Sequence, residues 1–121
     1  MAFAVALTCA CTAQTENEDI TIKDVDVVEF EALIEQGSGT ILDVRTAEEF
    51  SEGSIDGAVN MDFYASDFAQ QLEGLNKEQP VYVYCAAGGR SAKAMAQMEE
   101  MGFTEVYNLL GGYGAWSEAH E

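Results

Sequence analysis

The feature that most narrowly limits how this chain can fold is the stretch from residue 81 to residue 101. The apolar, β-branched run Val81–Tyr84 predicts a buried strand, and it leads directly into Cys85. A pair of glycines follows, and a helical pattern begins at Ala92. The chain must therefore form a strand, a tight loop and a helix in immediate succession, with a thiol as the first loop residue.

A cysteine in this position faces the N-terminal end of a helix, where unpaired backbone N–H groups and the helix dipole favour an anion. Both effects lower the pKa of a thiol, so that the nucleophilic thiolate exists near neutral pH. Gly88 and Gly89 allow the backbone to curl into an anion-binding nest. The alternative is a small buried cysteine that only fills the core. We favour a reactive Cys85, because a Gly-Gly-Arg-Ser sequence at the start of a helix serves no packing purpose.

The rest of the chain alternates short apolar runs with helical patterns. The expected strands are residues 40–44, 58–61, 81–84 and 106–109, and the expected helices are residues 27–36, 66–75, 92–101 and 115–119. Asp26 is the expected N-cap of the first helix, and Thr46 with Glu49 fits a capping box. This alternation predicts an α/β fold with a mostly parallel central sheet and helices on both faces. The loops at the carboxyl ends of such strands form the ligand crevice.

Four motifs follow one another along the chain in a recognisable order. They are Asp43-Val44-Arg45; Glu49-Phe50 with Gly53-Ser54-Ile55-Asp56-Gly57-Ala58-Val59-Asn60; Cys85-x-x-Gly88-x-Arg90-Ser91; and Leu109-Leu110-Gly111-Gly112-Tyr113-Gly114-Ala115-Trp116. In these motifs the chain resembles a single rhodanese-like (thiosulfate sulfurtransferase) domain, from about Val25 to Trp116. The resemblance implies the rhodanese-like three-layer fold. Two positions depart from the family pattern: Ser54 replaces the usual histidine, and Ala86 occupies a position that is often basic.

The resemblance also implies a sulfurtransferase mechanism. The Cys85 thiolate would attack the outer sulfur of thiosulfate or of a persulfide or polysulfide donor, and the resulting persulfide would pass its sulfur to a thiol or to cyanide. The backbone N–H groups of the loop suit both the thiolate and the persulfide. The expected substrate-binding residues are Ala86, Ala87, Gly88, Gly89, Arg90 and Ser91.

Several side chains near this loop have two alternative roles. Arg90 either binds the sulfonate of the donor or forms a structural ion pair that holds the loop. Ser91 either caps the helix or donates to the sulfur, and we favour capping. The resemblance implies that Asp43 supports the loop and that Arg45 pairs with Glu49. These three residues are expected to act mainly on stability.

A cysteine in such a loop is also found in two other kinds of function. Cysteine-dependent phosphatases also combine a thiolate, an amide nest and an arginine, but their loop has five residues between cysteine and arginine, whereas four separate Cys85 from Arg90. The shorter loop favours sulfur over a phosphoryl group, and it disfavours arsenate reductase relatives with the wider loop. The second alternative is a non-catalytic module that relays sulfur from a protein donor, which Ala86 and Ser54 favour modestly.

Charge and cysteine usage limit the partners. The chain has 22 acidic and 5 basic residues, a net charge of −17, so nucleic acid and anionic membranes are unlikely partners. The expected partners are a small sulfur-containing anion or persulfide donor and a thiol acceptor, including a protein thiol, and we expect a monomer. We expect no cofactor and no metal, because Cys9 and Cys11 lack a second ligand pair and His120 is the only histidine.

The N-terminal residues differ from the rest. We divide the chain into residues 1–19, an apolar segment with an acidic tether, and a rhodanese-like domain at 20–121. The run from Ala2 to Ala13 resembles the end of a secretory signal with a lipoprotein cleavage site, which makes Cys11 the lipidation candidate. This interpretation predicts the cell envelope or periplasm of a bacterium. The alternative is a tail without function on a cytoplasmic protein.

Overall fold

A single parallel sheet forms the centre of the molecule. The computed structural model describes residues 20–121, so the expectations for residues 1–19, Cys11 included, lie outside the described part. The strands are β1 (Thr21–Val25), β2 (Thr40–Asp43), β3 (Val59–Asn60), β4 (Val81–Tyr84) and β5 (Glu105–Leu109). They are ordered β1-β5-β4-β2-β3, and every pairing is parallel. The mostly parallel sheet expected from the alternating pattern is confirmed.

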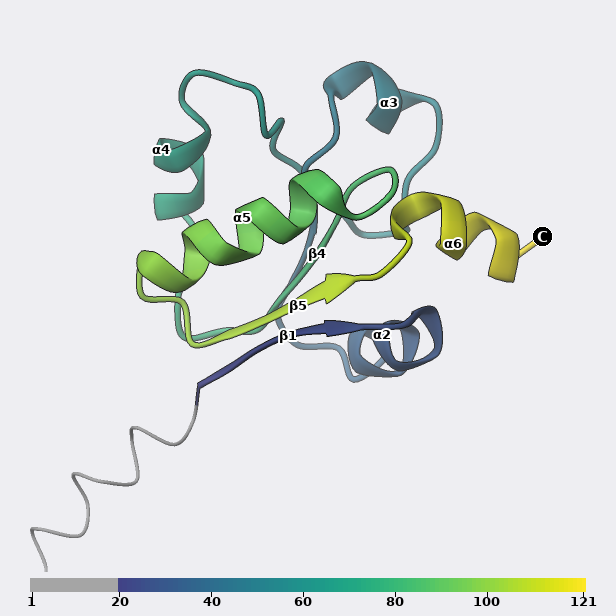
Figure 1. Cartoon of the computed structure of the whole chain (residues 1–121), viewed down its shortest axis with the longest axis horizontal. Coiled ribbons are helices and arrows are strands. Elements are labelled where there is room, and N and C mark those ends of the chain that lie inside the picture. The colour runs from purple at the N-terminus through teal and green to yellow at the C-terminus, as the bar shows by residue number, and fades with distance from the viewer. Residues whose placement is uncertain (1–19) are drawn as a thin grey trace, which may run out of the picture.

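Helices cover both faces of this sheet. They are α2 (Val27–Ile34), α3 (Ala47–Ser51), α4 (Phe68–Glu73), α5 (Gly89–Glu100) and α6 (Gly112–Ala119). Helices α4 and α5 pack on one face, while α2 and α6 pack together on the other (Figure 1). The three-layer α/β architecture is therefore as expected. Within residues 20–121 no helix has the length and hydropathy needed to cross a bilayer.

The central strand β4 supplies both halves of the core, because successive side chains point to opposite faces. Val81, Val83 and Cys85 belong to the cluster under α4 and α5, whereas Tyr82 and Tyr84 belong to the cluster under α2 and α6. All five are buried. The same alternation that builds the core therefore places the thiol on the α5 side of the sheet.

Two differences from the expected elements have clear physical reasons. Strand β1 was not expected, because it lies at the edge of the sheet, pairs only with β5, and exposes Lys23 and Asp24. Such a strand lacks the apolar pattern of a buried one. Helix α5 begins at Gly89, three residues before the expected Ala92. Glycines are poor helix formers, so sequence pattern alone disfavours a start at that position.

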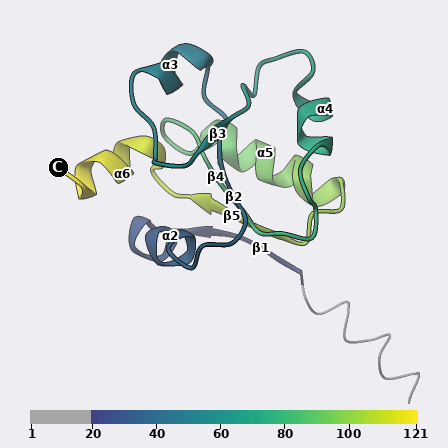
Figure 2. The same ribbon diagram turned by 180° about the vertical axis from the view of Figure 1, so that it is seen from behind.

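In this topology a ligand site is expected at the carboxyl ends of β2 and β4. From β2 the chain continues outward to β3, and from β4 it continues outward to β5, so the two neighbouring strands define a topological switch point. Figure 2 shows α3 above this end of the sheet, on the same side as the loop that leads into α5. The start of α6 lies at this end too (Figures 1 and 2). Residues from β2, α3, the β4–α5 loop and α6 therefore meet here.

Candidate active site

The thiol of Cys85 lies at the end of β4, beside the first turn of α5. The residue is 1% exposed. Its Sγ accepts a hydrogen bond from the Gly88 backbone N–H at 3.1 Å, and the Ser91 hydroxyl oxygen lies 3.3 Å from it. The structure thus brings Cys85, Gly88 and Ser91 together, as the strand–loop–helix pattern predicted.

The environment of Cys85 combines burial with several hydrogen-bond donors. Burial raises the pKa of the Cys85 thiol, because it disfavours the charged form. The Ser91 hydroxyl and the backbone N–H groups of Ser91, Gly88 and Ala87 stabilise the thiolate and outweigh burial, so the pKa of Cys85 is lowered overall. A thiolate is the nucleophilic form of cysteine. The site therefore favours nucleophilic chemistry at sulfur.

A single glycine allows the loop to turn into the helix. Gly88 is the N-cap of α5 and has φ +114°, a backbone conformation that residues with a side chain rarely adopt. Because the helix begins at Gly89, both Arg90 and Ser91 belong to its first turn rather than to the loop. The expectation that Ser91 caps the helix is wrong. Its hydroxyl lies 3.2 Å from the Gly88 carbonyl oxygen and can donate either to that oxygen or to the Cys85 sulfur.

Arg90 forms a two-pronged ion pair with Glu49 of α3. The Nη1–Oε1 distance is 2.9 Å and the Nη2–Oε2 distance is 3.2 Å. Glu49 also completes the predicted capping box, because its Oε1 accepts from the Thr46 backbone N–H at 2.9 Å. The hydrogen bond from Arg90 and that from Thr46 lower the pKa of Glu49 to about 2. Of the two roles considered for Arg90, the structure shows the ion pair.

Arg45 does not pair with Glu49, and this expectation from the family resemblance is wrong. Its Nη2 lies 2.8 Å from Oδ2 of Asp43, and its Nε lies 3.1 Å from Oδ1. Residues two apart near the end of a strand point to the same side, so the Asp43 carboxylate is within reach. Both side chains are buried, where an unpaired charge is costly. Arg45 Nη2 also donates to the Gly53 carbonyl oxygen at 2.6 Å, which ties the β2 end to the loop after α3.

The first turn of α6 holds the active loop from the other side. The Tyr113 N–H donates to the Cys85 carbonyl oxygen at 2.7 Å, and the Gly114 N–H donates to the Ala86 carbonyl oxygen at 3.1 Å. A side chain on Gly112 would place its Cβ 2.5 Å from the Cys85 carbonyl oxygen. The carbonyl oxygens of Cys85 and Ala86 therefore face α6, while the Gly88 N–H faces the sulfur.

The described contacts connect the Asp43 side chain to the loop through two other residues. Its carboxylate holds Arg45, whose guanidinium lies 4.4 Å from the centre of the Tyr113 ring. Tyr113 in turn donates its backbone N–H to Cys85. The Asp43 side chain is thus linked to the loop through Arg45 and Tyr113, and its supporting role stays a prediction.

Two residues of the site were missed by sequence reasoning. Tyr113 was part of the closing glycine-rich motif but had no role assigned. Tyr64 is 69% exposed, and its ring centre lies 5.7 Å from Cζ of Arg90. The Gly-Gly pair at 111–112 was a signal that two backbone segments approach closely there. No comparable signal marks Tyr64, because it comes from a loop that only the fold brings to Arg90.

Several known proteins are similar to this chain in sequence or in fold. Thiosulfate sulfurtransferase GlpE of Shewanella oneidensis is 33% identical over 100 residues, covering 83% of this chain and 97% of that protein. Chloroplastic thiosulfate sulfurtransferase 16 of Arabidopsis thaliana is 40% identical over 87 residues, covering 64% of this chain and 72% of that protein. The crystal structure of a rhodanese-like domain protein from Staphylococcus aureus matches with a TM-score of 0.69 and 32% identity. That match covers 78% of this chain and 90% of the other.

The family itself follows from a match over most of the described residues. A model of the rhodanese-like domain matches residues 26–119, which include β2, β4, the Cys85 loop and the first turn of α6. These are the segments that hold the thiol and turn the loop N–H groups toward it. The chain therefore belongs to the rhodanese-like domain family.

Proposed function

We propose that this protein is a sulfurtransferase that carries sulfane sulfur as a persulfide on Cys85. The donor is thiosulfate or a persulfide or polysulfide, and the acceptor is a thiol or cyanide. One observation carries the proposal: a thiol of lowered pKa accepts the Gly88 N–H and lies beside the Ser91 hydroxyl at the start of α5. Two relatives named thiosulfate sulfurtransferases support it.

The chemistry proceeds in two balanced steps. The Cys85 thiolate attacks the outer sulfur of the donor, a new S–S bond forms at Sγ, and the donor's own bond to that sulfur breaks. The electron pair of the broken bond leaves with the donor, as sulfite from thiosulfate or as a thiolate from a persulfide. The acceptor thiolate then attacks the outer sulfur of the Cys85 persulfide and restores the enzyme thiolate.

Burial of the thiol is compatible with the second step of this route. Cys85 is 1% exposed, but the outer sulfur of a persulfide lies about 2 Å beyond Sγ. The acceptor therefore meets this outer atom rather than Sγ. The N–H groups that stabilise the thiolate also stabilise the negative charge of the persulfide.

The size of the loop supports sulfur over phosphoryl transfer. Only four residues separate Cys85 from Arg90, and Arg90 is engaged by Glu49. A phosphoryl group needs donors for three equatorial oxygens, and a free arginine is the usual partner for them. A single sulfur atom needs only the N–H groups that already face Sγ.

The test is the mass of the protein after exposure to thiosulfate, polysulfide, mercaptopyruvate and glutathione persulfide in parallel. We expect Cys85 to gain one sulfur atom with at least one donor and to lose it when a thiol or cyanide is added. Cys9 and Cys11 serve as internal controls, because they show whether other thiols of the same chain also gain sulfur. Cys85→Ser should remain folded by circular dichroism and lose the transfer. A Cys85→Ser protein that retains substantial transfer would contradict the mechanism.

A further inference from the structure

One large aromatic side chain near the start of α5 is largely exposed to solvent. Within residues 20–121, Tyr64 is the only aromatic among the large hydrophobic residues that are exposed, and 69% of it is accessible. It belongs to the loop between β3 and α4. Aromatic rings bury a large apolar area when a partner covers them, and tyrosine is therefore enriched at binding surfaces. The ring of Tyr64 offers an apolar face to a molecule that approaches from solvent.

The fold holds Tyr64 in a defined place despite its exposure. Its backbone N–H donates to Oδ1 of Asp62 at 2.9 Å, and the backbone N–H of Phe63 donates to the Val44 carbonyl oxygen at 3.1 Å. The Phe63 ring packs edge-on against Tyr64, with 5.5 Å between the ring centres, and also against the buried Phe68. The exposed ring is thus attached both to the chain that follows β2 and to the core under α4.

Arg90 connects this ring to the sulfur. The centre of the Tyr64 ring lies 5.7 Å from Cζ of Arg90, in the first turn of α5. The next residue, Ser91, places its hydroxyl oxygen 3.3 Å from the Cys85 sulfur. The Glu49 hydrogen bond raises the pKa of Arg90 most and the Cys85 thiolate raises it further, so the sulfur is within electrostatic range of Arg90. Tyr64 therefore lies beside the same turn of α5 that contacts the sulfur.

The second step of the proposed reaction brings a molecule to this place. The acceptor thiolate attacks the outer sulfur of the Cys85 persulfide from the side opposite Sγ, because the entering and leaving sulfur atoms lie nearly in line. Sγ is covered by the loop and the start of α5, so the carbon group of the acceptor must lie on the outside of these segments. From Ala86 to Gly89 the loop has no side chain larger than a methyl group. It therefore leaves the carbon group free to contact larger side chains nearby.

We infer that Tyr64 is a specificity-determining residue of the second step: its exposed ring packs against an apolar carbon group of the acceptor thiol and so favours acceptors that carry one. This inference rests on the proposed persulfide chemistry of Cys85 and adds the class of acceptor to it. The net charge of −17 disfavours acceptors with further negative charge, so the favoured carbon group is neutral as well as apolar.

The step itself is balanced. The acceptor R–S⁻ forms a bond to the outer sulfur of the protonated persulfide Cys85–S–SH, and the bond between Sγ and that sulfur breaks. Its electron pair stays on Sγ. The products are R–S–SH and the Cys85 thiolate, and no oxidant or reductant is needed. Tyr64 takes no part in the bond changes and contacts only the group R.

The experiment follows the second step alone, on full-length protein whose Cys85 has first gained one sulfur atom from the fastest of the four donors named above. The readout is the rate at which Cys85 loses this atom, measured by mass. Three acceptors are compared: benzyl mercaptan, 2-mercaptoethanol and cyanide. The two thiols have similar acidity, but only benzyl mercaptan has an apolar ring, and cyanide carries no substituent that could contact Tyr64.

Three variants complete the design. Tyr64→Ala removes the ring, and Tyr64→Phe removes only the hydroxyl. Val28→Ala is the matched control, because it also removes an exposed hydrophobic side chain, but from α2 on the other face of the sheet.

The measured quantity is the ratio of the benzyl mercaptan rate to the 2-mercaptoethanol rate. We expect Tyr64→Ala to lower this ratio about five-fold relative to the wild type, as expected for the loss of one aromatic contact. The cyanide rate should stay near that of the wild type in this variant, because cyanide does not reach the ring. Tyr64→Phe, which keeps the ring, and Val28→Ala should both keep the wild-type ratio.

Three results would overturn the inference. The first is the same ratio of rates in Tyr64→Ala and Val28→Ala. The second is an equal slowing of all three acceptors in Tyr64→Ala, which would make Tyr64 a structural residue that only supports Arg90. The third is a ratio that falls as far in Tyr64→Phe as in Tyr64→Ala, which would assign the effect to the hydroxyl. A Cys85 that gains sulfur from none of the donors is a different outcome, since it contradicts the persulfide mechanism itself and the inference falls with it.

Discussion

At the scale of single residues, the site depends on which group neutralises which charge. Cys85 is buried, yet its pKa is lowered, because the Ser91 hydroxyl and the backbone N–H groups of Ser91, Gly88 and Ala87 stabilise the thiolate more than burial disfavours it. Arg90 contributes to the architecture by joining α3 to α5 through Glu49. The thiolate thus relies on dipoles fixed by the backbone rather than on a free cation. Dipoles held in place before the reaction cost no reorganisation when charge develops.

Replacing Ser91 with alanine tests the contribution of the hydroxyl. We expect the rate of Cys85 alkylation by iodoacetamide at pH 7 to fall about ten-fold, because a hydrogen bond to a charged group is lost. The midpoint of the rate–pH profile should move to higher pH, since the thiolate is less stabilised. Ser66→Ala, which changes an exposed serine, is the control. Equal profiles for the two variants would show that the hydroxyl serves only the Gly88 carbonyl oxygen.

At the scale of elements, two helix N-termini approach the active loop from opposite sides. The start of α5 directs N–H groups at the sulfur, and the start of α6 binds the carbonyl oxygens of Cys85 and Ala86. Because each peptide group has an N–H and a C=O pointing in opposite directions, fixing the carbonyls toward α6 orients the following N–H groups. Gly112 makes this possible, since any side chain there would collide with the loop backbone.

Gly112→Ala should therefore damage the loop more than the fold. The added Cβ would lie 2.5 Å from the Cys85 carbonyl oxygen, and the loop must move. We expect the free energy of unfolding to fall by about 1–3 kcal/mol. We also expect most of the sulfur-transfer activity to be lost.

Gly102→Ala is the matched control for this variant. Gly102 also has a positive φ, +101°, but its Cβ would enter open space at the end of α5. It should cost about 1 kcal/mol of stability from backbone strain and retain transfer activity. Denaturant unfolding and a transfer assay measure the two effects separately. Equal activity losses in the two variants would refute a specific role for the α6 contact.

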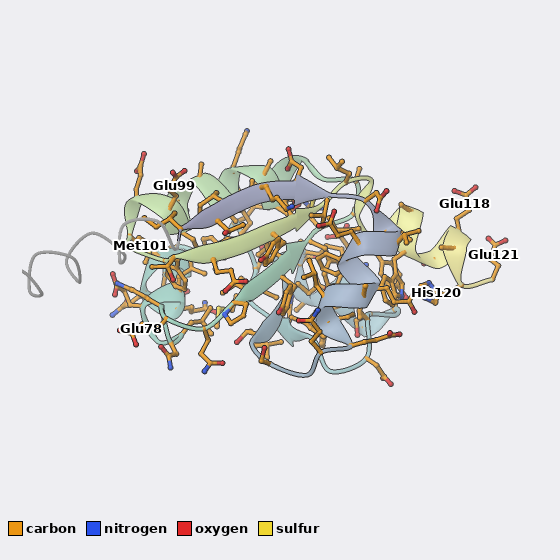
Figure 3. All side chains as sticks on the ribbon, turned by 90° about the horizontal axis from the view of Figure 1, so that it is seen from below. Glu78, Glu99, Met101, Glu118, His120 and Glu121 are labelled. Carbon is orange, nitrogen blue, oxygen red and sulfur yellow. The ribbon has the colours of Figure 1, made fainter. Side chains whose placement is uncertain are left out.

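At the scale of the whole molecule, acidic residues lie at both ends of the three-layer fold. Figure 3 shows Glu78 and Glu99 at one end of the molecule and Glu118 and Glu121 at the other. Most of the basic residues form ion pairs with nearby carboxylates. The surface as a whole is therefore negative, which increases solubility and repels anionic partners.

The location of the protein is a prediction that rests on residues 1–19. If the apolar run ends in a lipoprotein cleavage site, Cys11 becomes the acylated residue, and several acyl chains hold the domain stably at a membrane. Fractionation of cells that express the full chain should find it in the membrane fraction. Cys11→Ala should release it or prevent its processing. Both forms found in the soluble fraction with Met1 retained would contradict export.

Much of the fold and part of the site were predictable from local patterns. The strand at β4, the caps at Asp26 and Thr46, and the thiol at the start of a helix depend on residues close together in sequence. The edge strand β1 was missed, because an edge strand does not need an apolar pattern. The pairing of Arg45 was predicted wrongly, because two carboxylates, Asp43 and Glu49, lie within a few residues of it.

The amino-acid sequence alone determined the position of Cys85, its loop and the sheet in which they lie. These features follow from propensity, periodicity and glycine spacing, which act over a few residues. Only the tertiary structure decided which partner each charged group takes and which segment holds the loop carbonyls. Arg90 pairs with Glu49, which lies 41 residues away in the sequence. The carbonyl oxygen of Cys85 accepts a hydrogen bond from the Tyr113 N–H. Such contacts depend on how helices from distant segments pack at one end of the sheet. The local sequence pattern does not predict that packing.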